Sequence, residues 1–492
     1  MTRTPLNPEQ ESQLIAESKK LLLIAGEWSK SADGKTFPVE DPSTGDELCR
    51  VSDAGPRDAR HALDSASAAQ AGWAAVAPRE RAEILRKAYE LIVAHQEDLA
   101  LLITLENGKP LAEARGEVLY GADFFRWFSE EAVRIDGRYN TAPNGQGRYI
   151  VLKQPVGPCL FITPWNFPIA MGCRKIAPAA AAGCTMVVKP AEQTPISMLA
   201  LADLLTEAGF PAGVLNVLPT SNPGPVVDAI IDDPRLRKLS FTGSTEVGKD
   251  LFRKSAGNLL KLSMELGGNA PFIVFDDADI EQAVAGAIIA KMRNAGQACV
   301  AANRFYVHES VAERFISGLS DQMSKMRVGR GTQRSVQVGP LIDASGQRKV
   351  NDLVADAIQR GARTAAAPAQ VADRGYFTPP VVLIDLAPDS RLLHEEIFGP
   401  VAPVVIFKTD EEAITSANNT PNGLVSYFYS QNLSRCIKTA EALEAGMVGV
   451  NRGFVSDASA PFGGIKHSGF GREGGREGIE DYLEVKYVAL SI

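Results

Sequence analysis

The order of apolar and polar positions predicts alternating strands and helices through the middle of the chain. Four apolar runs, each followed by a segment with helical spacing, lie between Gly157 and Gly268. The strand candidates are 159–163, 185–189, 214–218 and 238–242, and the helix candidates are 169–182, 196–208, 226–231 and 244–256. This alternation is typical of a parallel, doubly wound sheet. Such sheets bind ligands at the carboxyl ends of their strands.

A second alternating block follows the first. It starts with a strand at 272–275 and a helix at 279–290, and it ends near Val448. Upstream of both blocks, 22–42 has the pattern of short strands, with a turn at Asp33-Gly34. Two helices are expected over 57–107 and another over 111–133. The pattern predicts an α/β protein with two doubly wound parallel sheets.

Two further strands do not fit either block. One is expected at 149–156, and the other at 482–488, where apolar and charged side chains largely alternate. Alternation of this kind is typical of an edge strand with one wet face, to which another subunit can add a strand. We therefore expect a homodimer or a homotetramer.

Composition narrows the function classes. A chain of 492 residues is long enough for two or three domains, and its net charge of −8 argues against a nucleic-acid partner. The segment 1–20 is polar and 21–24 is too short for a signal sequence, while the uncharged stretch 154–173 contains four prolines that would break a spanning helix. We expect no membrane association.

The six cysteines and five histidines are dispersed along the chain. No CxxC or CxxH spacing occurs, so neither a disulfide framework nor a metal site is predicted. Free cysteines fit a reducing cytosol, so we expect a cytoplasmic protein.

One cysteine has a distinctive setting. Cys299 follows the polar turn of Asn294, Gly296 and Gln297. An isolated cysteine is most often a buried structural thiol. The turn instead suggests a turn-to-helix junction, where a helix N-terminus would lower the pKa of the thiol and create a nucleophile.

Two other side chains complete a set for covalent carbonyl chemistry. Glu265, 34 positions upstream of Cys299, is followed by Leu-Gly-Gly, and Asn166 lies between Trp165 and Phe167. Taken singly, Glu265 is explained by a surface salt bridge and Asn166 by a turn. Together with Cys299 they supply a base, an oxyanion donor and a nucleophile.

Six motifs carry a family resemblance across nearly the whole chain from about Leu22. In order they are Thr163-Pro-Trp-Asn-Phe-Pro168, Lys189-Pro-Ala-Glu-Gln-Thr-Pro195, Phe241-Thr-Gly-Ser-Thr-Glu-Val-Gly248, Met264-Glu-Leu-Gly-Gly268, Gly296-Gln-Ala-Cys299 and Glu395-Glu-Ile-Phe-Gly-Pro400. In this order they resemble the NAD(P)-dependent aldehyde dehydrogenase superfamily. The resemblance implies that Cys299 attacks the aldehyde, that Asn166 and the Cys299 N–H hold the oxyanion, and that Glu265 activates water to release the acid.

The resemblance also implies a cofactor site. Gly243 and Ser244 would meet the pyrophosphate, Lys189 and Glu192 the adenosine ribose, and Glu396 the nicotinamide ribose, while Trp165 and Phe398 would pack near the cofactor. The Glu192 carboxylate would accept from a ribose 2′-OH and repel a 2′-phosphate. NAD is therefore favoured over NADP.

Within the superfamily, the chain is most similar to the succinate-semialdehyde dehydrogenases. The segments 172–175, 267–277 and 291–294, and Ser456 ahead of Pro461-Phe-Gly-Gly464, carry this similarity. In that branch two arginines and a serine hold the distal carboxylate of the substrate, and they map onto Arg174, Arg293 and Ser456. Some members have a second cysteine two positions after the nucleophile, and this chain has Ala301 there.

The resemblance divides the chain by role. Residues 1–136 and 157–264 would form the NAD-binding domain, 265–448 the catalytic domain, 137–156 and 478–492 the oligomerisation strands, and 449–477 the lining of the substrate entrance. The main expectation is oxidation of succinate semialdehyde, with glutarate semialdehyde or another ω-carboxy aldehyde as the alternative substrate. A CoA-acylating enzyme is a further alternative, which Glu265 disfavours because that route needs no base to activate water. A non-catalytic binding protein is another, which the intact set of Cys299, Glu265 and Asn166 disfavours.

Overall fold

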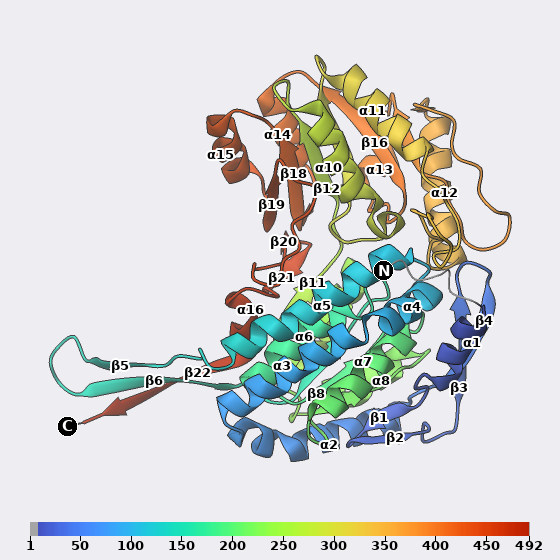
Figure 1. Ribbon diagram of the computed structural model, residues 1–492. Helices are drawn as coiled ribbons and strands as arrows, with labels where there is room; N and C mark the ends of the chain where they lie inside the picture. The colour runs from blue at the N-terminus through green and yellow to red at the C-terminus, as the bar shows by residue number, and fades with distance from the viewer. Residues whose placement is uncertain (1–7, 492) are drawn as a thin grey trace.

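The computed structural model describes residues 8–491. An N-terminal helix α1 (Pro8–Glu17) precedes a β-hairpin, β1 (Leu22–Ile24) with β2 (Glu27–Ser29), and a second antiparallel pair, β3 (Thr36–Asp41) with β4 (Asp46–Ser52). Two sheet domains lie one above the other in Figure 1, and a long β arm extends to one side.

The lower sheet in Figure 1 has eight strands in the order β2-β1-β9-β8-β7-β10-β11-β21. Its five central strands are parallel: β9 (Leu215–Val217), β8 (Met186–Lys189), β7 (Cys159–Ile162), β10 (Lys238–Thr242) and β11 (Lys261–Glu265). The short β21 (Gly469–Phe470) pairs antiparallel with β11. Every residue of β7, β8 and β10 is buried, which is typical of a parallel sheet covered on both faces.

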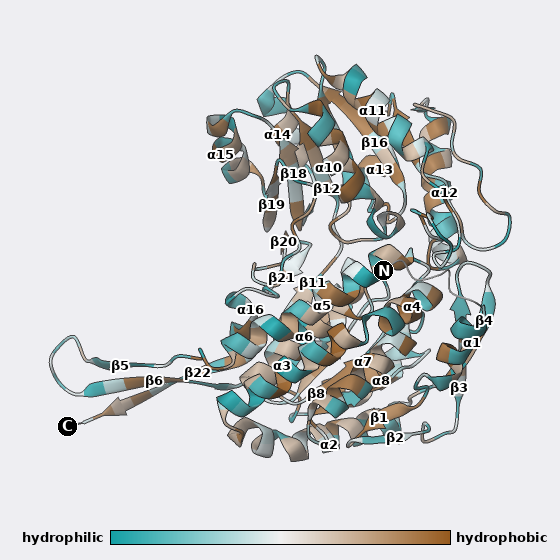
Figure 2. Cartoon of the chain, viewed as in Figure 1, coloured by the Kyte–Doolittle hydropathy of each residue, from teal (hydrophilic) through white to brown (hydrophobic). Residues whose placement is uncertain are grey.

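Helices cover both faces of this sheet, as the predicted doubly wound arrangement requires. One face packs against α2 (Pro56–Ala75), α8 (Pro223–Ile231) and α9 (Thr245–Ser255). The other packs against α3 (Pro78–Ala94), α4 (Gln96–Asn107), α5 (Leu111–Glu131), α6 (Ala170–Ala182) and α7 (Pro195–Ala208). Figure 2 shows hydrophilic and hydrophobic residues mixed along outer helices such as α2 and α3, which bury one side each, whereas α6 is buried on all sides.

The upper sheet has seven strands in the order β14-β15-β16-β13-β12-β18-β19. All except β14 (Arg363–Thr364) run parallel: β15 (Val381–Ile384), β16 (Val401–Phe407), β13 (Ala302–His308), β12 (Ala270–Val274), β18 (Val425–Tyr429) and β19 (Met447–Val450). The helices α10 (Ile280–Met292), α11 (Ala312–Ser324), α12 (Ala344–Gln359) and α13 (Arg391–His394) pack into one core, and α14 (Asp410–Asn418) with α15 (Leu433–Ala442) into another.

The arm is a three-stranded sheet in the order β22-β6-β5 (Figure 1). It joins β5 (Arg138–Thr141) and β6 (Arg148–Pro155) to β22 (Leu483–Leu490), so the two strands expected outside the main blocks pair with each other. β22 is an edge strand, and Val485 and Tyr487 on it are 65% and 67% exposed. The remaining short elements are η1 (Ala256–Asn258), η2 (Arg293–Gly296), β17 (Asn422–Gly423), β20 (Ile465–Lys466) and α16 (Glu477–Glu480).

The expectation of two helices over 57–107 was wrong, because this segment forms α2, α3 and α4. The last break lies at His95, which ends α3 and begins α4 with φ −98° and ψ 18°. A turn of this kind needs neither glycine nor proline, so the helical spacing runs through it. Between 8 and 491, no helix is both long enough and apolar enough to cross a membrane.

Candidate active site

The nucleophile candidate lies in a tight loop that leads into β13. Asn294, Ala295 and Gly296 have φ values of 50°, 54° and 78°, so three consecutive residues are left-handed. A side chain at Gly296 would approach the Gly399 carbonyl oxygen to 2.2 Å, which excludes any residue with a Cβ. The expected helix N-terminus at Cys299 was wrong, because Cys299 lies in a turn that enters a strand.

The environment of the sulfur also differs from the expectation. Burial, and then the charge of Glu265, raise the pKa of Cys299 well above its ordinary value. Without a helix N-terminus, no backbone dipole offsets the loss of water. The raised pKa favours the thiol form of Cys299, whose proton must be removed before the sulfur attacks a carbonyl.

Glu265 is the base candidate beside it. It is the last residue of β11, 4% exposed, and neither carboxylate oxygen has a hydrogen-bond partner in the part of the chain that the structure describes. Burial raises the pKa of Glu265 to about 7, against the opposing charge of Arg174. A carboxylate with a pKa near neutrality can accept a proton from a thiol or from water.

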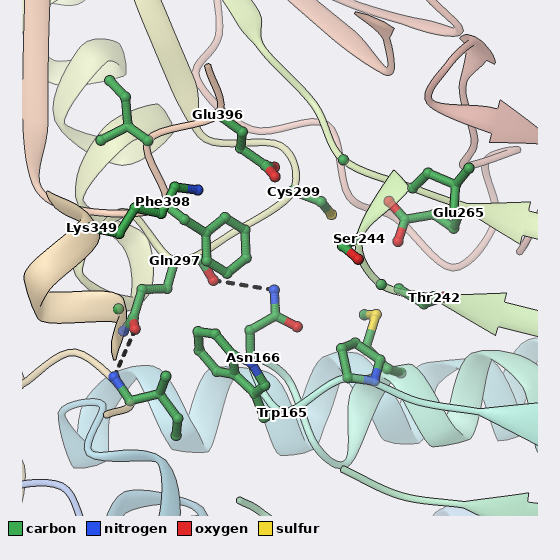
Figure 3. A pocket seen from close by; sticks show the side chains of 18 of the residues that line it. Trp165, Asn166, Thr242, Ser244, Glu265, Gln297, Cys299, Lys349, Glu396 and Phe398 are labelled. Carbon is green, nitrogen blue, oxygen red and sulfur yellow. Dashed lines mark hydrogen bonds between the residues drawn. The ribbon is translucent and has the colours of Figure 1, made fainter. Parts of the chain in front are cut away.

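Asn166 lies in the loop between β7 and α6, and it is buried. Its side-chain Nδ2 donates to the Gln297 carbonyl oxygen at 3.2 Å, as the dashed line in Figure 3 marks. Its own carbonyl oxygen accepts from Asn294 Nδ2 at 3.0 Å. These bonds join the Asn166 loop to the loop of Cys299, so the amide is held beside the sulfur.

A cleft of about 1020 Å³, including the part open to solvent, contains this set. Asn166, Ser244 and Glu265 follow or end β7, β10 and β11, at the carboxyl edge of the lower sheet, as the sequence predicted for ligand sites. Cys299 and Phe398 instead precede β13 and β16, so the upper sheet contributes through the amino ends of its strands. The cleft therefore lies between the two sheets.

Five of the seven residues expected to bind the cofactor line this cleft (Figure 3): Trp165, Gly243, Ser244, Glu396 and Phe398. Trp165 and Phe398 meet edge to face, with ring centroids 5.5 Å apart. Glu396 accepts from the Gly268 N–H at 3.0 Å. The Ser244 hydroxyl caps α9, where free N–H groups begin a helix.

Lys189 and Glu192 do not line the cleft. They lie at and just beyond the end of β8 and pair with each other at 3.7 Å. Glu192 keeps 41% of its side chain exposed.

The three residues expected to bind a distal carboxylate do not line the cleft either. Arg174 is buried on α6, where its Nη2 lies 2.7 Å from Glu473 Oε2 and its Cζ lies 3.9 Å from the centre of the Phe462 ring. Arg293 lies near two aromatic rings, Phe167 at 4.6 Å and Phe454 at 4.8 Å. Its guanidinium forms no salt bridge among residues 8–491, although its charge acts on the buried Glu113 and opposes the rise in the pKa of that carboxyl.

Tyr120, which lies in no motif of the sequence, is close enough to these residues for their charges to act on it. Its hydroxyl is buried without a hydrogen-bond partner in the described chain. Burial raises the pKa of Tyr120, while the charges of Arg174 and Arg293 and the side chain of Ser456 oppose that rise. The phenol is therefore influenced by Arg174, Arg293 and Ser456, the three residues expected to bind the distal carboxylate. Tyr120 is only partly buried on α5, so the apolar spacing of that helix did not single it out.

Two further residues of the cleft were not predicted from the sequence. One lies outside the six motifs, and the other lies inside a motif but was given no role. Lys349 comes from the second turn of α12, far along the chain from Cys299. Gln297 lies inside a quoted motif, and its Oε1 accepts from the Ile342 N–H at 2.9 Å (Figure 3). Between residues 8 and 491, no group of three or more His, Cys, Asp or Glu side chains is arranged to hold a metal ion.

Comparison with known proteins agrees with this geometry. The chain is 53% identical to a succinate-semialdehyde dehydrogenase of Paenarthrobacter nicotinovorans, over 90% of this chain and 99% of that protein. It is 50% identical to the NADP(+) succinate-semialdehyde dehydrogenase of Escherichia coli K12, over 96% and 97% of the two chains. It is 49% identical to a glutarate-semialdehyde dehydrogenase of Pseudomonas putida KT2440, over 95% and 97%.

The fold gives the same result. A crystal structure of succinate-semialdehyde dehydrogenase from Burkholderia pseudomallei matches with a TM-score of 0.95 and 46% identity, covering 100% of both chains. This confirms the predicted α/β fold with its two doubly wound sheets. Residues 28–488 match the model of the Aldehyde dehydrogenase family. The chain therefore belongs to the aldehyde dehydrogenase family, as its six motifs predicted.

Proposed function

We propose that this oxidoreductase converts succinate semialdehyde to succinate with NAD. The observation that carries the proposal is the convergence of Cys299, Glu265 and Asn166 on one cleft, with the guanidinium of Arg293, which forms no salt bridge in the described chain, over the ring of Phe167 next to Asn166. Relatives at about half identity are named for succinate semialdehyde. Glutarate semialdehyde is the alternative substrate, supported by a relative named for it.

The chemistry starts at Cys299. Once Glu265 or water has taken its proton, the sulfur adds to the aldehyde carbon and forms a thiohemiacetal. The oxyanion would lie between the Asn166 side-chain amide and the Cys299 N–H, which stabilise the developing charge. Glu265 then takes a proton from water that attacks the thioester, and the acid leaves.

The cleft fits a dinucleotide. It spans from the start of α9, where Gly243 and Ser244 can receive a phosphate, to Phe398 next to Cys299. The chemistry that a bound nicotinamide supplies is removal of hydride from the carbon held on Cys299, which leaves the thioester. Lys189 and Glu192 would contact the adenosine ribose. Because the exposed Glu192 carboxylate would repel a 2′-phosphate, we infer a preference for NAD, although one relative is named for NADP.

Arg293 is the better placed carboxylate anchor. Arg293 lies over two aromatic rings and forms no salt bridge in the described chain, whereas Arg174 is already paired with Glu473. A guanidinium binds a carboxylate through two parallel hydrogen bonds. We propose that Ser456 and Tyr120 complete this anchor and that Arg174 contributes mainly through its charge.

The domain roles follow from the same arrangement. We propose that 1–136 with 157–264 binds NAD, that 265–448 carries the nucleophile and that 449–477 lines the substrate entrance. We also propose that the strands within 137–156 and 478–492 bind a second subunit in a homodimer or homotetramer. Residues 1–7 and 492 of these ranges lie outside the described residues. With six free cysteines, of which the three deepest are fully buried, we place the protein in the cytoplasm.

The test is a comparison of kcat/KM for succinate semialdehyde, glutarate semialdehyde and uncharged butanal, with NAD and with NADP. We expect the C4 acid with NAD to give the highest value and Cys299→Ala to abolish NADH formation. Turnover that requires CoA would contradict the hydrolytic assignment. A higher kcat/KM for butanal than for either acid would contradict the substrate class.

A further inference from the structure

A buried cluster of charges lies behind the catalytic loop, outside the cleft. Lys109, between α4 and α5, has a fully buried side chain that forms an ion pair with the equally buried Glu117 of α5. The same Nζ donates to the backbone oxygen of Asn166 at 2.7 Å and lies 4.0 Å from the centre of the Phe167 ring. The three N–H directions of the ammonium group thus each have a partner.

Glu117 extends the cluster to α6. Its Oε1 accepts from the N–H groups of Ile169 and Ala170, at 3.0 and 3.3 Å. Free N–H groups at a helix N-terminus favour a carboxylate. One ion pair therefore ties both ends of the segment 166–170, with Asn166 at one end and the start of the helix that carries Arg174 at the other.

Glu113, one turn earlier on α5, reaches the other catalytic loop. Its Oε2 accepts from the Asn294 N–H at 2.6 Å, at the first of the three left-handed residues before Cys299. Asn294 Nδ2 donates back to the Asn166 oxygen. That oxygen therefore receives two donors, Lys109 and Asn294, and its orientation is fixed from two sides.

We propose that Lys109 and Glu117 are positioning residues for the oxidation, an inference that rests on the proposed function. Their ion pair sets the direction of the Asn166 backbone, and through it the direction of the side-chain amide that meets the oxyanion. A buried ion pair loses much of its Coulomb energy to desolvation, and apolar side chains of equal size would hold α5 against this loop at lower cost. What apolar side chains would not do is fix the orientation of one carbonyl group.

The variants must separate alignment from folding. Lys109→Met alone leaves a buried carboxylate unpaired and is expected to fold poorly. The pair Lys109→Met/Glu117→Gln removes both charges together, keeps the side-chain volume and leaves an amide oxygen for the N–H groups of Ile169 and Ala170. The matched control is Lys238→Met. Lys238 is also buried, donates to Ser263 Oγ at 2.5 Å and lies at the start of β10, away from the end that borders the cleft.

The readout is the pre-steady-state burst of NADH from succinate semialdehyde, whose amplitude counts active sites and whose rate reports the steps that need the oxyanion donor. We expect the double variant to slow the burst about 10- to 100-fold, since loss of one oxyanion donor costs about 10²- to 10³-fold. Binding of NAD should stay within twofold. Lys238→Met should lower the melting temperature and leave the burst rate per site within twofold.

A second arm tests whether the effect passes through Asn166. In an Asn166→Ala background, the double substitution should slow the burst less than threefold, because the group that it aligns is gone. An equal fold loss in both backgrounds, or a wild-type burst rate in the double variant, would overturn the proposal. Absence of NADH from the wild-type protein would instead overturn the proposed function, so the two failures are distinguishable.

Discussion

Glu265 should control the release of the acid with a titration near neutral pH. Burial raises its pKa from 4.5 to about 7, a penalty on the charged form of about 3 kcal/mol. With a pKa of 7, about one-tenth of Glu265 is ionised at pH 6 and about nine-tenths at pH 8. Because only the carboxylate can take a proton from water, hydrolysis of the thioester should be about tenfold slower at pH 6 than at pH 8. A carboxylate with an ordinary pKa would be ionised at both pH values, and the rate would be flat.

Stopped-flow measurement of NADH separates the two half-reactions. The burst reports acylation of Cys299, and the later steady rate reports hydrolysis when hydrolysis is slower. We expect the steady rate to rise between pH 6 and 8 and then level off. Glu265→Gln should keep a burst of about one NADH per site with almost no steady rate at any pH. A steady rate that changes less than twofold between pH 6 and 8, or a Glu265→Gln protein that turns over normally, would refute this role.

Four other outcomes follow from the site. Arg174→Met should move the midpoint of the Glu265 titration to higher pH at saturating substrate, because the Arg174 charge lowers that pKa; an unchanged midpoint would contradict it. Glu192→Ser should raise kcat/KM for NADP about tenfold or more and leave NAD less affected, measured with both cofactors. Arg293→Met should lower kcat/KM for succinate semialdehyde about 10- to 100-fold, the worth of a charged hydrogen bond, with butanal as the control that stays within threefold. Tyr120→Phe should raise KM for the semialdehyde about fivefold and leave the butanal KM unchanged, and equal effects on both would remove Tyr120 from the anchor.

Much of the fold was predictable because the parallel strands are buried on both faces. Such strands are often continuous apolar runs, and the run predicted at 159–163 is β7, Cys159–Ile162, in the structure. The strand that ends at Glu265 was not predicted, because Lys261-Leu-Ser-Met-Glu265 has no continuous apolar run. The break at His95 was not predictable, because a helix can turn there without the residues that usually mark an end.

The chemical set was predictable from residue types, but its environment was not. Asn294 and Ala295 have left-handed backbone angles although neither is a glycine. The Asn294 N–H donates to Glu113, which lies 181 positions earlier in the chain, and this hydrogen bond supports the conformation. The sequence indicates a polar turn there, but not that its backbone is left-handed. For the same reason the sequence placed Cys299 at a helix start, whereas the turn leads into β13.

Desolvation raises the pKa values of both Cys299 and Glu265. This shared cause gives Arg174 and Arg293 different roles. Both groups are buried at the junction of the sheets, and neither gains an anion-stabilising helix N-terminus, so desolvation dominates each of them. The charge that opposes it for both is Arg174, itself held by Glu473. If a substrate carboxylate bound Arg174, it would cancel that charge and raise the pKa of Glu265 further, which would slow hydrolysis. An anchor at Arg293 avoids this conflict, because Arg293 forms no salt bridge among the described residues and is not among the main charges that act on Glu265. Loss of Arg293 should therefore affect KM, and loss of Arg174 should affect the pH dependence.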